Sequence, residues 1–184
     1  LEGDFVRIGA MVTHTEIEDS DLIKEYAPLL STAAPYIAHR AIRNRGTWGG
    51  SIAYADPAAE WPTCLLALNG SVRLLGPNGE RIIAVDDFFT GLYTTAIEPD
   101  EILISCDIPI AKSSHWYAFE ELARRHGDYA IVGMAASANK EGDRLSQPRI
   151  VLLGVDTTPV RATKTEALLD GKRITEEVIA QAEA

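Results

Sequence analysis

Residues 43–51 have the sequence Arg43-Asn44-Arg45-Gly46-Thr47-Trp48-Gly49-Gly50-Ser51, in which three glycines lie among polar side chains. Glycine destabilises the interior of a helix or strand because it loses more backbone entropy than other residues. We therefore predict a loop in which Gly49 and Gly50 adopt positive φ and consecutive N–H groups converge on an anion, with the Thr47 and Ser51 hydroxyls as further donors. The alternative is a tight structural turn, because an isolated glycine cluster is a weak motif.

The residues that follow predict a helix. Asp56 has a typical N-cap side chain, and Pro57 suits the first helical position because its missing N–H would be unpaired there. We expect this helix to run from Pro57 through Leu65 and Leu66. Its N-terminus would place a partial positive charge close to the glycine segment, where an anion would be stabilised.

Five separated segments match one protein family in the same order. They are Ile8-Gly9-Ala10 with Thr13, Ile42-Arg43-Asn44 with Gly46-Thr47-Trp48-Gly49-Gly50-Ser51, Asp56-Pro57 with Glu60, Pro99-Asp100-Glu101-Ile102-Leu103, and Arg124-Arg125-His126-Gly127-Asp128-Tyr129-Ala130-Ile131-Val132. On these residues the chain resembles the flavin-binding subunits of molybdenum hydroxylases, which include the medium subunit of carbon monoxide dehydrogenase and the middle domain of xanthine dehydrogenase. The resemblance covers essentially the whole chain, and several collinear motifs are more specific than any one of them.

The resemblance implies an α+β fold. It predicts a truncated PCMH-type FAD-binding domain, an antiparallel sheet with flanking helices, followed by a small C-terminal subdomain of sheet and helices. Residues 1–110 are expected to form the second FAD-binding subdomain, and residues 111–184 the C-terminal subdomain, which we expect to be incomplete. The family has a further N-terminal subdomain with its own glycine-rich loop for the FAD pyrophosphate. Because the resemblance begins at Phe5, we expect this chain to carry half of the FAD cleft.

The resemblance also implies which residues hold FAD. The expected cofactor contacts are Ile8, Gly9, Ala10, Thr13, Thr47, Gly49, Gly50, Ser51, Glu60, Leu103 and Tyr129. Leu103 and Tyr129 match residues at the flavin end of the cofactor, whereas their apolar surroundings alone predict side chains that pack in a core. Three positions depart from the family pattern: Trp48 replaces the commoner Ile, Ser51 replaces Asn or Asp, and Glu60 replaces Asp.

The function implied by the resemblance is electron transfer. In this family a large molybdopterin subunit hydroxylates the substrate, a small subunit with 2Fe-2S clusters relays electrons, and FAD in the medium subunit passes them to an acceptor. We expect an oxidoreductase flavoprotein subunit of such a heterotrimer, inactive alone, with molybdopterin and 2Fe-2S clusters in the partner subunits only. Two other hypotheses stay open. The shortened chain folds without FAD as an assembly module, or its glycine segment holds another nucleotide.

The polar residues predict neither catalytic groups nor a metal site. Ser51, His126 and Asp128 are not arranged as a nucleophile–base–acid triad in the sequence. His14 and His39 have no His, Cys or carboxylate at metal-ligand spacing. Asp86-Asp87 is expected to cap a helix, because adjacent carboxylates rarely converge on one ligand.

Composition agrees with a globular protein. The chain has 184 residues, 46% of them hydrophobic, which is enough to bury a core. Its formal charge of −10 argues against nucleic acid and anionic membranes as partners. No apolar run approaches the roughly 20 residues that span a bilayer, and no leader pattern opens the chain, so we expect a cytoplasmic protein. Cys64 and Cys106 lie in apolar runs and are expected to be buried free thiols.

Hydrophobic periodicity and turn residues predict the remaining elements. Strands are expected over 5–10, 71–75, 81–85, 102–108, 116–119, 129–138 and 149–155, with a hairpin turn at 76–79 and a strand end at Pro109. Helices are expected over 22–26, where Pro28 ends this helix or opens the next, and over 34–42, 164–169 and 176–184. Helices followed by several successive strands favour the α+β class.

Overall fold

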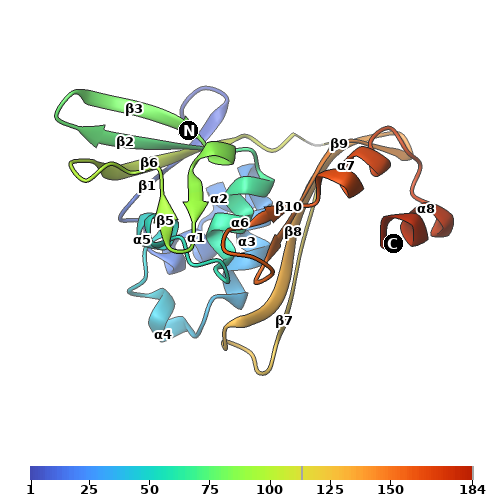
Figure 1. Ribbon diagram of the computed structural model, residues 1–184, viewed down its shortest axis with the longest axis horizontal. Helices are drawn as coiled ribbons and strands as arrows, with labels where there is room; N and C mark the ends of the chain where they lie inside the picture. Colours follow the sequence, from blue (N-terminus) through green and yellow to red (C-terminus); the bar gives the residue numbers. More distant parts are fainter. Residues whose placement is uncertain (113, 184) are drawn as a thin grey trace.

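The computed structural model describes residues 1–112 and 114–183. Two four-stranded antiparallel sheets lie on either side of a group of short helices (Figure 1). This mixture of helices and antiparallel sheets confirms the predicted α+β class.

The first sheet has the strand order β1-β6-β2-β3. Its strands are β1 (Phe5–Gly9), β6 (Ile102–Pro109), β2 (Ser71–Gly76) and β3 (Gly79–Ala84). The hairpin of β2 and β3 confirms the predicted turn, and β6 ends at Pro109 as predicted. Strand β6 pairs with the edge strand β1, and Gly9 at the end of β1 lies opposite Ser105. The C-terminal end of β1 therefore lies beside the middle of β6.

Seven short helices connect β1 to β2. They are α1 (His14–Asp19), α2 (Asp21–Tyr26), α3 (Pro28–Ala33), the 3-10 helix η1 (Ala34–Tyr36), α4 (Arg40–Arg43), α5 (Trp48–Tyr54) and α6 (Glu60–Ala67). Pro28 opens α3 at its first position, where its missing N–H costs nothing.

The predicted continuous helix over 34–42 is wrong. The chain leaves the helical conformation after Tyr36, because Ile37 is extended and Ala38 has φ 42°. The buried guanidinium of Arg43 donates to the carbonyls of Ile37 at 2.8 Å and Ala38 at 3.0 Å. These carbonyls are therefore satisfied by a side chain, and a helical hydrogen-bond ladder is not needed there.

The predicted glycine loop is also wrong, because Gly49 and Gly50 lie in the first turn of helix α5 and neither has positive φ. A Cβ on Gly49 would lie 2.5 Å from the Ala10 Cβ and 2.8 Å from the Ala10 carbonyl oxygen. Glycine is thus required at position 49 by close packing of α5 on the segment after β1. Tertiary packing outweighs the low helix propensity of the two glycines.

Pro57 does not begin a helix, so that prediction is wrong as well. Helix α5 ends at Tyr54, its C-cap residue Ala55 has φ 54°, and α6 begins at Glu60. The Asp56 carboxylate accepts a hydrogen bond from the Ala58 N–H at 2.9 Å. Asp56 therefore stabilises a turn between the two helices, in the way that Asp commonly does two residues before an N–H donor.

The second sheet has the order β10-β9-β8-β7. Its strands are β7 (His115–Ala123), β8 (Ala130–Glu141), β9 (Arg144–Leu153) and β10 (Val160–Arg161), followed by α7 (Thr163–Leu169) and α8 (Glu176–Glu183). The predicted strands and both C-terminal helices are confirmed within a few residues at their ends. Between β3 and β6 of the first sheet the chain forms η2 (Val85–Asp87) and a small hairpin of β4 (Phe89–Gly91) and β5 (Thr94–Thr95).

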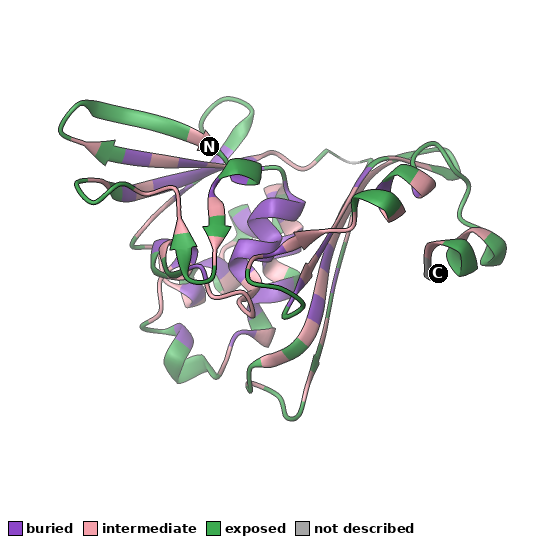
Figure 2. Cartoon of the chain, viewed as in Figure 1, coloured by how far each residue is buried: buried purple, intermediate pink, exposed green. Residues whose placement is uncertain are grey.

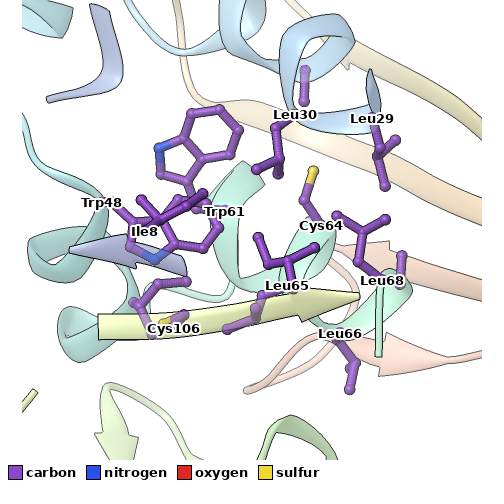
Figure 3. Packing of buried hydrophobic residues seen from close by; sticks show 14 of the residues in the cluster. Ile8, Leu29, Leu30, Trp48, Trp61, Cys64, Leu65, Leu66, Leu68 and Cys106 are labelled. Carbon is purple, nitrogen blue, oxygen red and sulfur yellow. The ribbon is translucent and has the colours of Figure 1, made fainter. Parts of the chain in front are cut away.

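The hydrophobic core joins α3, α5 and α6 to the inner faces of both sheets (Figure 2). Trp48 and Trp61 are completely buried, with ring centroids 5.4 Å apart. Figure 3 shows Ile8 and Cys106 of the first sheet beside Trp48. Cys64 and Cys106 are buried and free, as predicted.

Side chains of the second sheet hold the C-terminal end of α6. The Arg149 guanidinium donates to the Leu66 carbonyl at 2.9 Å, and the Ser137 hydroxyl donates to the Ala67 carbonyl at 2.6 Å. Arg149 also contacts Asp86 at 2.8 Å. The prediction that Asp86 caps a helix is therefore wrong: Asp86 lies within η2 and pairs with arginines of the second sheet.

Candidate cofactor site

The start of α5 is joined to the segment that follows β1. Three N–H groups here donate to nearby acceptors: Trp48 to the Val12 carbonyl at 2.8 Å, Gly49 to the Ala10 carbonyl at 2.9 Å, and Gly50 to the Thr47 hydroxyl at 3.2 Å. All three donors are thus paired within the chain. The predicted nest of converging N–H groups is therefore wrong. A ligand at this position would contact hydroxyl groups and exposed backbone atoms instead.

Two of the predicted site threonines are helix N-caps. Thr13 and Thr47 are bridged as neighbouring antiparallel residues. Thr13 forms a capping box with Glu16, in which the Glu16 carboxylate accepts from the Thr13 hydroxyl at 2.7 Å. Thr47 caps α5 by accepting from Gly50. The Thr13 hydroxyl proton is therefore engaged, whereas Thr47 can still donate its hydroxyl proton to a ligand.

One side of α5 faces away from the core. Thr47, Gly50, Ser51 and Tyr54 follow the i, i+3, i+4, i+7 spacing that places residues on a single helix face. Gly50 and Tyr54 are exposed, and Thr47 and Ser51 are partly exposed. A Cβ on Gly50 would meet only the Thr47 hydroxyl oxygen within 4 Å. We call these four residues the α5 face.

The strand residues of the predicted site lie behind this face. Ile8 and Leu103 are 3% and 5% exposed, so their side chains belong to the core. Gly9 and Ala10 are partly exposed at the end of β1, next to the N-terminus of α5. The structure thus brings together the residues predicted from positions 8–13, 47–51 and 103, although Ile8 and Leu103 offer a ligand little side-chain surface.

Glu60 lies apart from the α5 hydroxyls, among other acids. Burial raises the pKa of its carboxyl to about 7, against a hydrogen bond from its own N–H, and the charges of Glu121 and Asp56 raise it further. Glu121 itself has a buried carboxylate oxygen with no hydrogen-bond partner among the described residues. A carboxyl group with this pKa carries a proton in about half of the molecules at neutral pH and can donate a hydrogen bond.

Tyr129 is 79% exposed in the loop before β8, so it does not pack in the core. Sequence reasoning missed two tyrosines near it. Tyr54 ends α5, and Tyr93 lies in the turn between β4 and β5, with the two ring centroids 5.0 Å apart. Tyr54 lies seven residues after Thr47, so recognising 48–54 as a helix would have placed it on the same face as the predicted hydroxyl residues.

His14 supports the site from inside. Its Nδ1 accepts a hydrogen bond from the Trp61 indole at 2.9 Å, and a Cβ on Gly46 would lie 2.5 Å from its Nε2. Burial, with a smaller effect from the charge of Arg43, lowers the pKa of His14 to about 4. His14 is therefore neutral at physiological pH and fixes the loop that leads into α5.

The described ranges 1–112 and 114–183 contain neither a metal-binding cluster nor a helix that could span a membrane. No three His, Cys, Asp or Glu side chains are grouped so that they could hold a metal ion. Within the same ranges, every helix is too short or too polar to traverse a bilayer.

Comparison with known families accounts for this geometry. Residues 1–111 match the family described as FAD binding domain in molybdopterin dehydrogenase, and residues 117–184 match the CO dehydrogenase flavoprotein C-terminal domain. The chain belongs to the FAD-binding medium subunits of the molybdenum hydroxylases. The α5 face and the end of β1 thus lie in the FAD-binding domain of this family, and Tyr129 lies in the C-terminal domain.

Individual medium subunits are similar to the chain along its length. It is 41% identical to the nicotine 6-hydroxylase medium subunit of Paenarthrobacter nicotinovorans, over 95% of the chain and 61% of that relative. It is 36% identical to the carbon monoxide dehydrogenase medium chain of Hydrogenophaga pseudoflava, over 97% of the chain and 62% of that relative. The chain therefore spans about three-fifths of the length of the medium subunits it matches.

Solved structures of the family have the same fold. Carbon monoxide dehydrogenase from Hydrogenophaga pseudoflava, in a form that lacks the Mo-pyranopterin moiety of its cofactor, superposes with a TM-score of 0.96 at 38% identity. That match covers 99% of this chain and 63% of the solved chain. Quinoline 2-oxidoreductase from Pseudomonas putida 86 gives a TM-score of 0.92 at 36% identity, with 99% and 63% covered.

Proposed function

We propose that this chain is the FAD-binding, electron-transferring part of a molybdenum hydroxylase. The observation that carries the proposal is the exposed α5 face, in which Gly50 leaves a surface without a side chain beside the hydroxyls of Thr47 and Ser51. Family membership supports it, because the matched domain is described by FAD binding.

The residues present fit one side of an FAD molecule. Thr47 and Ser51 are partly exposed and offer hydroxyl groups that can donate to phosphate or ribityl oxygens. Gly50 allows those oxygens to approach the helix closely, because no Cβ occupies the space above it. Gly9 and Ala10 extend the same surface with small residues at the end of β1. The wider set of Ile8, Thr13, Gly49 and Leu103 positions these contacts by packing and capping.

When bound, FAD supplies the redox chemistry, accepting and releasing electrons. The chain's own residues orient the cofactor and keep it in place. We propose further that the molybdopterin and the 2Fe-2S clusters belong to a large and a small partner subunit, as the resemblance implies. In this proposal Tyr129, exposed in the loop before β8, and Glu60, at the start of α6, also contact the cofactor.

Calorimetric titration of FAD into the purified chain tests the proposal, with AMP and NAD as controls. We expect selective FAD binding with a dissociation constant below about 10 μM, which corresponds to roughly 7 kcal/mol. The absence of FAD binding to a folded chain would contradict the proposal and would favour a module that serves only in assembly. Equal binding of AMP, NAD and FAD would instead favour a general nucleotide site.

A further inference from the structure

A cleft of about 430 Å³ lies between the C-terminal end of α6 and strands β7, β8 and β9 of the second sheet. Its volume falls within the range of small-molecule sites, roughly 300–1,000 Å³. The cleft is lined by Leu68 and Asn69, which follow α6, whereas α5 leads into the other end of this helix at Glu60. A rise of about 1.5 Å per residue separates the two ends of α6 by roughly 12 Å. The cleft is therefore separate from the proposed FAD contacts on α5.

A β-bulge lies at the edge of the cleft. The register of β8 and β9 shifts between Ser137 and Asn139, so that Gln147 and Pro148 of β9 lie opposite Ala138 alone. Gln147 has φ 50°, a conformation that residues other than glycine rarely adopt. Bulges often occur beside functional sites, where they redirect a side chain, and strained backbone positions are concentrated at such sites. The strained bulge is therefore a second indication, besides the volume, that the cleft binds a ligand.

Two carboxamide side chains at the bulge form a pair that lines the cleft. The Asn139 Nδ2 donates a hydrogen bond to the Gln147 Oε1 at 3.0 Å. This bond leaves the Asn139 Oδ1 with a lone pair that can accept and the Gln147 Nε2 with protons that can be donated. The pair thus presents one acceptor and one donor side by side. A ligand with an N–H and a C=O on adjacent atoms matches this arrangement, because it can donate to one amide and accept from the other.

The charged side chains of the cleft are already paired. The Arg149 guanidinium contacts Asp86 at 2.8 Å, and the Arg161 guanidinium contacts Asp86 at 3.0 Å and Glu166 at 2.6 Å. No carboxylate is among the described residues that line the cleft. An uncharged ligand is therefore favoured, because an anion would compete with Asp86 and Glu166 for the arginines and a cation would find no acid.

The remaining walls of the cleft suit a flat ring. The rings of His115 and Tyr117 are perpendicular, at 86°, and the His115 Nδ1 lies 2.8 Å from the Tyr117 hydroxyl. Burial raises the pKa of Tyr117 to about 12 and lowers the pKa of His115, so both rings are neutral at physiological pH. Leu68 and Pro148 add apolar surface. Aromatic and apolar walls bind the faces of a planar ring, while the amide pair binds its edge.

We propose that this cleft binds a flat, uncharged heterocycle that carries a cyclic amide. The amide N–H of the ligand donates to the Asn139 Oδ1, its C=O accepts from the Gln147 Nε2, and its ring lies against Tyr117. The inference goes beyond the proposed FAD binding and does not depend on it, because the cleft and the α5 face lie at different ends of α6. It gives the chain a second small-molecule site, in the C-terminal domain.

The test is a calorimetric titration of the chain with three related ligands. The probe 2-quinolone has the cyclic amide, 1-methyl-2-quinolone lacks its N–H, and quinoline lacks its C=O. The variant Gln147→Met removes the donor and keeps an unbranched side chain of similar length. Gln181→Met is the matched control, because Gln181 is exposed on α8. Thermal unfolding confirms that each variant is folded, and the 2-quinolone titration is repeated in the presence of excess FAD.

We expect 2-quinolone to bind about tenfold more tightly than either of the other two ligands, because each of them leaves one amide of the pair without its partner. Gln147→Met is expected to weaken 2-quinolone binding about tenfold, and Gln181→Met is expected to match the wild type. Excess FAD is expected to leave 2-quinolone binding unchanged.

Equal binding of 2-quinolone and quinoline, or an unchanged affinity in Gln147→Met, would overturn the inference. The absence of 2-quinolone binding to the folded chain would overturn it as well. Displacement of 2-quinolone by FAD would place the heterocycle in the proposed FAD site and would also overturn it. A chain that binds 2-quinolone but not FAD would support this inference and contradict only the proposed function.

Discussion

At the scale of single residues, Gly49 and Gly50 are adjacent but have different roles. Gly49 is required by packing, because its Cβ would lie within 2.8 Å of three Ala10 atoms, two of them in the backbone. We predict that Gly49→Ala destabilises the fold by about 1–3 kcal/mol, the usual cost of an overpacked core. Urea unfolding measures this change, and a variant as stable as the wild type would contradict the packing of α5 on Ala10.

Gly50 faces outward, so a substitution there should affect binding more than folding. A Cβ would lie 2.8 Å from the Thr47 hydroxyl, which weakens the α5 cap, and loss of a cap costs about 1 kcal/mol. We expect Gly50→Val to remain folded and to lose FAD affinity, because its branched side chain occupies the surface between Thr47 and Ser51. Fluorescence titration measures the loss, and an unchanged FAD affinity would remove the α5 face from the account.

Glu60 should make the stability depend on pH. Its folded pKa of about 7 lies above the ordinary 4.5, so the stability present below pH 4.5 is lost as pH rises through 7. Glu60→Gln mimics the protonated form, and we expect it to be more stable than the wild type above pH 7 by up to about 3 kcal/mol. The difference should vanish below pH 4.5. Denaturation curves at pH 4 and pH 8 that show the same difference would contradict this prediction.

His14 should make the stability depend on pH in the opposite direction to Glu60. Its folded pKa of about 4 lies below the ordinary 6.5, so the stability present above pH 6.5 is lost as pH falls through 4. We expect His14→Gln, which can still accept from the Trp61 indole, to lack this part of the pH dependence, worth up to about 3 kcal/mol in the wild type. Parallel pH profiles of the wild type and the variant would show that His14 is not buried as a neutral imidazole.

At the scale of the elements, Arg149 of β9 joins the two halves of the molecule through the Leu66 carbonyl and Asp86. We predict that Arg149→Met lowers the free energy of unfolding by about 1–3 kcal/mol, because a buried carbonyl loses its partner. Arg125→Met is the matched control, since the Arg125 side chain is 86% exposed, and it should change stability by no more than about 0.5 kcal/mol. Equal effects of the two substitutions would show that the link is unimportant.

The elements also show how far sequence reasoning reaches. The strands were predictable because alternating apolar residues such as Val6 and Ile8 point into the core. The helices around the site were not, because long-range contacts determine them. Close packing on Ala10 favours a helix at Gly49, and the Arg43 guanidinium binds the Ile37 and Ala38 carbonyls just after the helical run ends. These contacts join residues that local patterns treat as independent.

Long-range contacts also limit how far the sequence predicts the site. The resemblance placed positions 8–13, 47–51 and 103 together, and the structure has them adjacent. It gave no sign that the N–H groups of Trp48 and Gly49 are already paired, because their acceptors follow from the docking of α5. Tyr93 could not be assigned from sequence, since its approach to Tyr54 depends on how the β4–β5 hairpin folds over α5. The roles of the individual residues in binding FAD stay predictions.

At the scale of the whole molecule, a central group of helices lies between two antiparallel sheets (Figure 1). Because the chain carries a formal charge of −10, the proposed binding of an anionic cofactor requires local hydroxyl and backbone contacts rather than attraction by the overall field.

The most direct test of this account is a map of backbone amide chemical shifts in the chain as FAD is added. The account predicts that the largest changes fall on 47–54, on the turn that carries Tyr93 and on the loop that carries Tyr129, with small changes in β9 and α8. Shifts confined to the second sheet and α8, or a folded chain whose spectrum does not change at saturating FAD, would contradict it.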